Sequence, residues 1–209
     1  MILDRLVDRI ERLRSDKPER RVLVGIAGPP GAGKSTLAEA IAFRLRVHCT
    51  HVPMDGFHLD DDALDRLGLR DRKGAPETFD AEGFAALLDR LAQGWPAYAP
   101  AFDRSIEQPV ANGIWVDELR PIVVSEGNYL LLPEPRWQAV RSAFDEVWFC
   151  DLDDAVRRER LVHRHVEFGK SPDRARAWVE RVDEPNAALV KECAHLADLH
   201  LDMGAFDIG

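Results

Sequence analysis

The 209-residue sequence predicts a three-layer α/β/α fold, with a mostly parallel sheet of five strands between two layers of helices. Short apolar runs rich in β-branched residues, which are typical of buried parallel strands, alternate with segments whose apolar residues recur at helical spacing. This alternation supplies the crossover connections that parallel strands require. We expect residues 1–209 to form a single domain, because this length suits one hydrophobic core.

The first half of the chain is predicted to contain three helices and two strands. The N-terminal segment has apolar residues at helical spacing and charges of both signs throughout, which excludes a secretory signal peptide. A β-branched run that ends in glycine follows it, as expected for a buried strand. In chain order, the predicted elements are residues 1–20, 21–27, 34–46, 47–53 and 78–94.

The second half is predicted to contain a long loop, three strands and two helices. The segment 95–118 is rich in proline and glycine, which favours a surface loop with room for short strands. Ser171 and Pro172 are typical of a helix N-cap and first turn, and this helix should run towards residue 195. The other predicted elements are strands at 121–127, 146–152 and 199–203 and a strongly basic helix at 153–169.

The composition excludes several classes of protein. Apolar residues make up 45% of the chain and charged residues 31%, as in an ordinary globular protein of the cytoplasm. No apolar stretch approaches the roughly 18 residues of a membrane span, so we expect no membrane association. The formal net charge of −9 argues against a nucleic-acid-binding surface. The three cysteines are far apart, which predicts buried free thiols.

The segment GPPGAGKS (28–35) fits the phosphate-loop pattern G-x-x-x-x-G-K-[ST], between a predicted strand and a predicted helix. Glycines let backbone N–H groups converge on phosphate oxygens, and the helix N-terminus adds its positive dipole. We expect Lys34 to reach the β- and γ-phosphates, Ser35 to hold Mg²⁺, and the Thr36 amide to assist at the α-phosphate. The predicted ATP-binding residues of this segment are Gly28, Pro30, Gly31, Ala32, Gly33, Lys34, Ser35 and Thr36.

Two carboxylates follow predicted strands and should meet the phosphate loop. Asp55 comes after the second strand and Glu126 ends the third, and ligands of parallel α/β sheets bind beyond these strand ends. A kinase needs a carboxylate near the γ-phosphate to orient and deprotonate a hydroxyl, and cations to neutralise the transferring group. A turn role for Asp55 and a structural role for Glu126 are the alternatives. The acidic run at 60–62 is interpreted as helix capping.

With these motifs, residues from about Arg21 to Met203 resemble the superfamily of uridine kinase, phosphoribulokinase and bacterial pantothenate kinase. MDGFH (54–58) is similar to a strand-end element of that superfamily, which implies that Asp55 is the catalytic base and a contact of metal or substrate. VVSEGNYLL (123–131) resembles its "EG" strand end, which implies that Glu126 lies near Mg²⁺ and substrate.

The resemblance also implies a lid and a substrate loop. DLDDAVRRERLVHR (151–164) matches the lid helix, with a lid region of 153–171, and its arginines are Arg157, Arg160 and Arg164. Their spacing of three and four residues places them on one helical face, where we expect them to close over triphosphate; a solvated basic face is the alternative. PAFDRS (100–105) is similar to the substrate loop, with Phe102 in place of a tyrosine.

The substrate is less well defined by these motifs. RKGAPETFD (72–80) resembles a pantothenate kinase segment, and together with MDGFHLDD and WVERVDEPNAALV (178–190) it is similar to bacterial proteins described as fructose transport system kinases. A histidine of the uridine kinases and the aromatic cover of the pantothenate kinases are missing. The expected substrate-binding residues are Asp55, His58, Phe102, Arg104, Glu126, Asn128 and Tyr129.

The sequence therefore predicts an ATP-dependent kinase that phosphorylates a hydroxyl of a small metabolite, with a fructose-like sugar favoured. The expected catalytic residues are Asp55, Lys34, Arg160 and Arg164, and the expected Mg²⁺ contacts are Ser35, Glu126 and Asp55. A uridine, other nucleoside or pantothenate kinase is the alternative within this class, and a non-catalytic ATP-binding regulatory protein is the alternative outside it. The family likeness also implies a homodimer.

Overall fold

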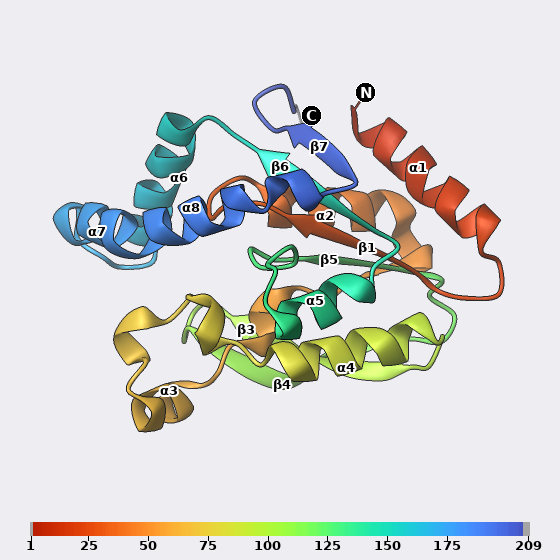
Figure 1. Cartoon of the computed structure of the whole chain (residues 1–209), viewed down its shortest axis with the longest axis horizontal. Helices are drawn as coiled ribbons and strands as arrows, with labels where there is room; N and C mark the ends of the chain where they lie inside the picture. The colour runs from red at the N-terminus through yellow and green to blue at the C-terminus, as the bar shows by residue number, and fades with distance from the viewer. Residues whose placement is uncertain (1, 207–209) are drawn as a thin grey trace.

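The computed structural model of the chain describes residues 2–206. Its centre is a sheet of five strands in the order β2-β5-β1-β6-β7, and all of the pairings are parallel (Figure 1). The predicted five-stranded α/β architecture is confirmed. The strands are β1 (Val22–Ala27), β2 (Cys49–His51), β5 (Ile122–Glu126), β6 (Glu146–Asp151) and β7 (Leu199–Asp202).

Alternate residues of the strands pack against helices on opposite faces of the sheet. Val24 and Ile26 of β1 belong to a buried cluster with α1 (Ile2–Asp16) and α2 (Lys34–Leu45). Leu23 belongs to a second cluster, with α4, α5 and α8. Each buried Leu or Ile side chain stabilises the fold by about 1.5–3 kcal/mol. The bounds of these three helices are Ala81–Ala92 for α4, Pro135–Ser142 for α5 and Glu184–Glu192 for α8.

The segment predicted as a long surface loop is instead mostly an antiparallel hairpin of β3 (Ala97–Asp103) and β4 (Gln108–Val116). Ala97 and Ala99 are buried while Tyr98 between them is exposed, so the strand has the period of two. The pairing register shifts at Pro100, which has no N–H to donate to a ladder. Pro100 is therefore accommodated by this irregularity, while Pro109 pairs with Phe102 in the ladder.

The helix predicted from Ser171 towards residue 195 is divided into three parts. α7 (Pro172–Trp178) is followed by a π turn at Val179–Asp183, which we call the π segment, and then by α8. Pro185 lies in the first turn of α8 and has no N–H, so it cannot donate the hydrogen bond to the preceding turn that would continue a regular α-helix. The basic helix before them, α6 (Asp154–Glu167), agrees with the prediction.

The acidic run at 60–62 caps a helix, as predicted. The side chain of Asp60 accepts a hydrogen bond of 2.7 Å from the Ala63 amide at the start of α3 (Asp61–Leu67).

Among residues 2–206, no helix is both long and apolar enough to cross a membrane. Single 3₁₀ turns occupy Arg46–His48, Met54–Phe57, Arg70–Arg72, Pro76–Thr78 and Ala194–Leu196.

Candidate active site

Two adjoining cavities lie beyond the carboxyl ends of β1, β2 and β5. The first has a volume of about 370 Å³ and is lined by residues of the 70–79 region and of the helices α6 and α7. The second has a volume of about 520 Å³ and extends along α6 to the residues after β7. The phosphate loop and two arginines connect the cavities, since both are lined by Gly31, Lys34, Ser35, Arg104 and Arg164.

The phosphate loop has a backbone that only glycine adopts readily. Gly31 and Gly33 have φ of +82° and +91°, in the left-handed region. A Cβ on Gly31 would also lie 2.8 Å from Cγ of Leu161 in α6. Of the other loop residues, Pro30 lines the first cavity and Thr36 the second, while Ala32 is buried in the core. The N-terminus of α2 thus opens at the junction of the cavities, a position suited to phosphate.

Lys34 is buried at this junction and is held by two oxygens of the chain. Its Nζ donates to the Pro29 carbonyl at 3.1 Å and to Oδ1 of Asn128 at 2.7 Å. Burial lowers the pKa of Lys34, and the charge of Glu126 partly opposes this effect. A buried ammonium whose hydrogen-bond partners are neutral oxygens gains charge-assisted hydrogen bonds when phosphate oxygens enter. Asn128, which was expected to bind substrate, is thus a direct hydrogen-bond partner of Lys34.

Ser35 and Glu126 form a second polar pair beside the lysine. The Ser35 hydroxyl donates to Oε1 of Glu126 at 3.0 Å, and Glu126 is only 4% exposed. Burial raises the pKa of Glu126 to about 7, and the charge of Asp55 adds to the increase. A divalent cation would relieve this repulsion, so the donor set fits Mg²⁺. No group of three or more His, Cys, Asp or Glu suited to a metal occurs within residues 2–206.

Asp55 lies on the 3₁₀ turn that follows β2 and lines the first cavity. Its Oδ2 accepts a hydrogen bond of 3.2 Å from Arg104 of the β3–β4 connection. The adjacent Gly56 is required by packing, because a Cβ there would lie 2.3 Å from the carbonyl oxygen of Pro100. The MDGFH segment therefore forms a turn and also lines the cavity with Asp55. Gly56 lets the β3–β4 hairpin approach the turn, and the hairpin places Arg104 beside Asp55.

His58 and Phe102 line the first cavity together. The His58 ring packs between Phe79 and Phe102, with centroid distances of 3.9 and 4.8 Å. Its Nδ1 is 2.8 Å from the carbonyl oxygen of Asp55, and a carbonyl only accepts, so Nδ1 carries the proton and Nε2 is left as an acceptor. Burial lowers the pKa of His58, which favours this neutral form.

The three arginines of α6 are not placed alike, contrary to the expectation that all of them face triphosphate. Arg164 lines both cavities and Arg160 the second. Arg157 is 1% exposed, pairs with Asp154 and Glu184, and donates to the Pro30 carbonyl at 3.3 Å. Arg157 thus joins α6 to the phosphate loop and to α8. Helical spacing correctly places the three arginines on one face of α6. That face is covered at Arg157, where the helix contacts the phosphate loop, and it is open to the cavities at Arg160 and Arg164.

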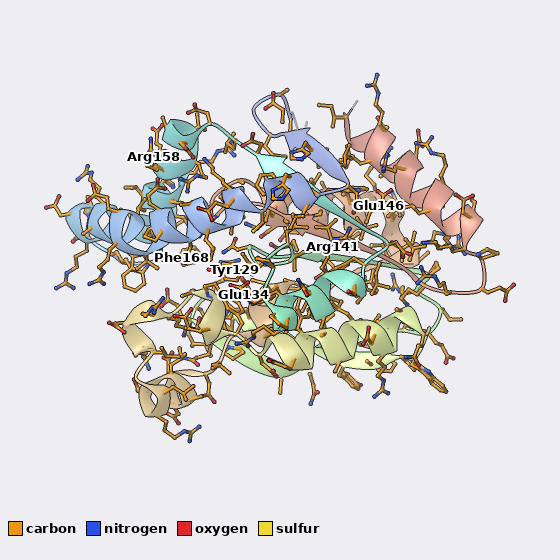
Figure 2. All side chains as sticks on the ribbon, viewed as in Figure 1. Tyr129, Glu134, Arg141, Glu146, Arg158 and Phe168 are labelled. Carbon is orange, nitrogen blue, oxygen red and sulfur yellow. The ribbon has the colours of Figure 1, made fainter. Side chains whose placement is uncertain are left out.

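Tyr129, which was expected among the substrate-binding residues, does not line the first cavity. Its side chain is fully buried among Phe79 and Trp137, close to the start of α5 (Figure 2). Its hydroxyl donates to the carbonyl oxygen of Gly74, a residue that lines the first cavity. Phe102 alone of the two predicted aromatic residues therefore contacts the cavity, and Tyr129 supports the loop behind it.

Several residues of the first cavity escaped the sequence predictions. It is also lined by Lys73, Lys170 and Asp183. The buried Nε2 of His51 has no hydrogen-bond partner among residues 2–206 and lies 4.0 Å from Oε1 of Glu126. Burial lowers the pKa of His51 to about 4. Lys73 lies within the segment 72–80 and Asp183 within the segment 178–190, and both segments carried the family resemblance. The resemblance therefore indicated the segments that form the cavity wall. Only the fold identifies the side chains.

Comparison with known proteins shows the family of the chain. Residues 23–205 match the Phosphoribulokinase / Uridine kinase family. The chain is 34% identical over 206 residues to YggC of Escherichia coli, covering 95% of this chain and 84% of that protein. It is 36% identical over 178 residues to a proposed uridine kinase of Schizosaccharomyces pombe, covering 80% and 75%.

A solved structure is also similar over nearly the whole chain. The crystal structure of a proposed fructose transport system kinase from Silicibacter sp. superimposes with a TM-score of 0.87 at 37% identity, covering 96% of this chain and 99% of that one. The family match and the shared fold establish the class of protein. The chain belongs to the phosphoribulokinase and uridine kinase family, whose P-loop kinases act on small metabolites.

Proposed function

We propose that the protein transfers the γ-phosphoryl group of ATP to a hydroxyl of a small polyhydroxylated metabolite, with a fructose-like sugar as the favoured acceptor. The observation that carries the proposal is the junction of the two cavities. Lys34 and Ser35 of the phosphate loop line both cavities, and Asp55 lines only the first. A phosphoryl group bound at the junction would therefore have nucleotide on one side and a carboxylate with an acceptor on the other.

The second cavity suits the nucleotide. Besides the phosphate loop and Arg160, it is lined by the apolar side chains of Phe168, Met203 and Phe206. Apolar and aromatic side chains of this kind bind the faces of a base, while the amides at the start of α2 and Lys34 bind the phosphates. Phe168 follows directly on the last residue of α6 (Figure 2). The lid helix would thus contact both the base and the phosphates.

The first cavity suits a compact polar acceptor. Asp55 would accept the hydroxyl proton as the oxygen attacks, and Arg104 keeps the carboxylate oriented until the acceptor enters. Nε2 of His58 would accept a hydrogen bond from a neighbouring hydroxyl, and Phe102 would pack against carbon atoms. When bound, Mg²⁺ would supply neutralisation of the β- and γ-phosphates, held by Ser35 and Glu126, with Asp55 nearby.

Arginines of the lid helix would complete the site. Arg164 lines both cavities, and neither a carboxylate nor any other hydrogen-bond partner holds its guanidinium among residues 2–206, although burial lowers its pKa. A cation desolvated in this way is suited to stabilise negative charge that develops on the transferring group. Closure of α6 over the nucleotide would also exclude water, which would otherwise hydrolyse ATP.

Support for a sugar comes from the similarity to the Silicibacter protein and from the polar lining of the first cavity. The similarity to the Schizosaccharomyces protein favours the alternative, a uridine or other nucleoside acceptor. A non-catalytic ATP-binding protein would need neither Asp55 nor Arg164 at the junction. The homodimer implied by the family likeness stays a prediction.

The proposal is tested by ATP consumption with Mg²⁺ across a panel of fructose, other ketoses, ribose, uridine, cytidine and pantothenate. Wild type would be compared with Asp55→Asn and with Asp62→Asn, a matched change at an exposed position of α3. We expect turnover with one class of acceptor, reduced more than about a hundredfold in Asp55→Asn and unchanged in Asp62→Asn. Tight ATP binding without turnover on any acceptor would favour the regulatory alternative. Turnover that survives Asp55→Asn would remove Asp55 as the base.

A further inference from the structure

We infer that Asp183, held in place by His165, is a specificity-determining residue that accepts a hydrogen bond from a second hydroxyl of the acceptor, remote from the one that is phosphorylated. Asp183 was not among the predicted site residues, and it lies on the wall of the first cavity that the π segment builds. This inference rests on the proposed function, since it assigns part of the chemistry of the same acceptor.

The π segment directs this wall into the cavity. Trp178, Val182, Asp183 and Asn186 all line the first cavity. In a continuous α-helix, steps of four residues would drift by about 40° around the axis at each step, because a turn takes 3.6 residues. A π turn contains more residues per turn, so residues four and five apart stay on one side of the helix. π turns of this kind occur frequently at functional sites.

His165 orients the Asp183 carboxylate. Its Nε2 lies 2.8 Å from Oδ2 of Asp183, and the side chains are 14% and 11% exposed. The His165 ring also packs edge-on against Trp178, at a centroid distance of 6.4 Å. Within residues 2–206, no other side chain is hydrogen-bonded to the carboxylate, so Oδ1 has no side-chain partner. Because Asp183 lines the first cavity, a hydroxyl of an acceptor bound there would supply Oδ1 with a donor.

The wall is also fixed to the opposite side of the cavity. Nδ2 of Asn186 donates to the Gly74 carbonyl at 3.4 Å, and the Tyr129 hydroxyl donates to the same oxygen. Asp183 is therefore held by α6 through His165, while the helix that follows it, α8, is held to the 72–80 segment through Asn186. A carboxylate restrained in this way at one place on the wall selects acceptors by where their hydroxyls lie.

A second consequence concerns charge. A carboxylate at this wall disfavours an acceptor that bears its own phosphate or carboxylate near Asp183, although the cavity is also lined by Lys34, Arg70, Lys73, Arg104, Arg164 and Lys170. Lys73 is already bound by Asp61 at 2.6 Å, and Lys170 lies 5.0 Å from the ring centroid of Trp178. The chemical class that Asp183 favours is thus a neutral polyol, with at least one hydroxyl besides the one that reacts.

The experiment measures acceptor binding separately from catalysis. Dissociation constants would be determined by isothermal titration calorimetry with Mg²⁺ and a non-hydrolysable ATP analogue present, using D-fructose, its monodeoxy derivatives, D-ribose and uridine as probes. The variants are Asp183→Asn, which removes the charge at constant shape, and His165→Gln, which removes the orienting imidazole. Glu180→Gln, an exposed position of the π segment, is the matched control.

We expect Asp183→Asn to weaken the binding of a polyol roughly 10- to 100-fold and His165→Gln to weaken it by a smaller factor, while the affinity for the ATP analogue stays within about threefold. One monodeoxy derivative should bind the wild type more weakly than its parent by a similar factor, and this difference should disappear in Asp183→Asn. If Asp183 only stabilised the fold, its substitution would not remove the difference in affinity between a polyol and one of its monodeoxy derivatives.

Two outcomes would overturn the inference: none of the probes binds the wild type, or a polyol binds Asp183→Asn as tightly as wild type. The second would leave the kinase proposal intact if that polyol is also phosphorylated. Conversely, a polyol whose binding depends on Asp183 but that is never phosphorylated would support the inference and remove the proposed reaction. The two proposals can therefore fail independently.

Discussion

The hydroxyl of Ser35 donates a hydrogen bond of 3.0 Å to Glu126, a carboxylate that is almost completely buried at the end of β5. This contact joins the phosphate loop to the central sheet. It also stabilises a charge that burial and Asp55 both disfavour, since together they raise the Glu126 pKa from 4.5 to about 7.

The contribution of Glu126 to the stability of the protein without divalent cation should therefore fall as the pH rises, while the lowered pKa values of His51 and His58 act in the opposite direction and are the same in the Glu126→Gln control. A carboxyl group whose folded-state pKa is raised binds more protons in the folded state, so its contribution is complete below about pH 4.5 and is lost as the pH passes about 7. The loss is on the order of 3 kcal/mol. Denaturant unfolding in EDTA at pH 5 and pH 8 measures it. Glu126→Gln should lose this component of the pH dependence, and an identical dependence in both proteins would contradict the assignment.

Arg164 should contribute to catalysis and Arg158 should not. Arg164 lines both cavities, whereas Arg158 lies on the exposed side of α6 and pairs with Glu184 (Figure 2). We expect Arg164→Gln to reduce kcat on the order of 10²- to 10³-fold, because a desolvated cation beside the transferring phosphoryl group is lost. The matched Arg158→Gln should remain within about twofold of wild type. Steady-state rates of both variants with the reactive acceptor decide the question, and equal rates would rule out the assigned role.

Arg157 should matter for stability more than for chemistry. Its guanidinium is buried and bonded to Glu184, Asp154 and the Pro30 carbonyl. Removing one partner of a buried ion pair leaves the other uncompensated, so we expect Arg157→Met to lower the free energy of unfolding by about 3–5 kcal/mol. Urea denaturation gives this value, with Arg158→Met as an exposed control expected within about 0.5 kcal/mol of wild type. A stable Arg157→Met with a greatly increased KM for ATP would return Arg157 to the nucleotide site.

Tyr129→Phe should weaken the fold slightly and leave acceptor binding almost unchanged. The substitution removes the hydrogen bond to the Gly74 carbonyl, and such bonds contribute about 0.5–1.5 kcal/mol. Because Tyr129 lies behind the cavity wall, the KM for the acceptor should change less than about threefold. Thermal unfolding and initial rates measure the two quantities. A large change of KM at unchanged stability would mean that the tyrosine contacts substrate.

Gly56→Ala should reduce activity although glycine has an ordinary φ at this position. The added Cβ would lie 2.3 Å from the Pro100 carbonyl oxygen, so the turn that carries Asp55 or the hairpin that carries Arg104 must move. A displacement of about 1 Å at a reacting group can cost on the order of a hundredfold in rate. We therefore expect a decrease in kcat of at least roughly tenfold, measured with the acceptor at saturation. Wild-type kcat in a folded Gly56→Ala would show that the approach of the hairpin does not position Asp55.

Features that depend on residues close in sequence could be predicted from the sequence. The strands of the central sheet, the phosphate loop and the cap at Asp60 are encoded by local patterns, because burial period, glycine conformation and capping act within a few residues. Asp55 and Glu126 could be placed near the phosphate loop as well, since the ends of parallel strands lie along one edge of a sheet. The segment of the β3–β4 hairpin was predicted as a surface loop with room for short strands, because its prolines and glycine are loop signals, and only the pairing defines the two strands.

The sequence by itself therefore determined that this chain has an α/β fold with a phosphate loop and carboxylates at its strand ends. The tertiary structure decided which side chains reach the cavities. Arg157 and Arg164 share a helical face, yet one is covered by the phosphate loop and α8 while the other faces both cavities. Tyr129 is turned inward, and His165 meets Asp183 only because α6 packs against the π segment. Helical spacing gives the direction of a side chain around its own axis, whereas its partners depend on how separate elements pack, and no local pattern contains that information.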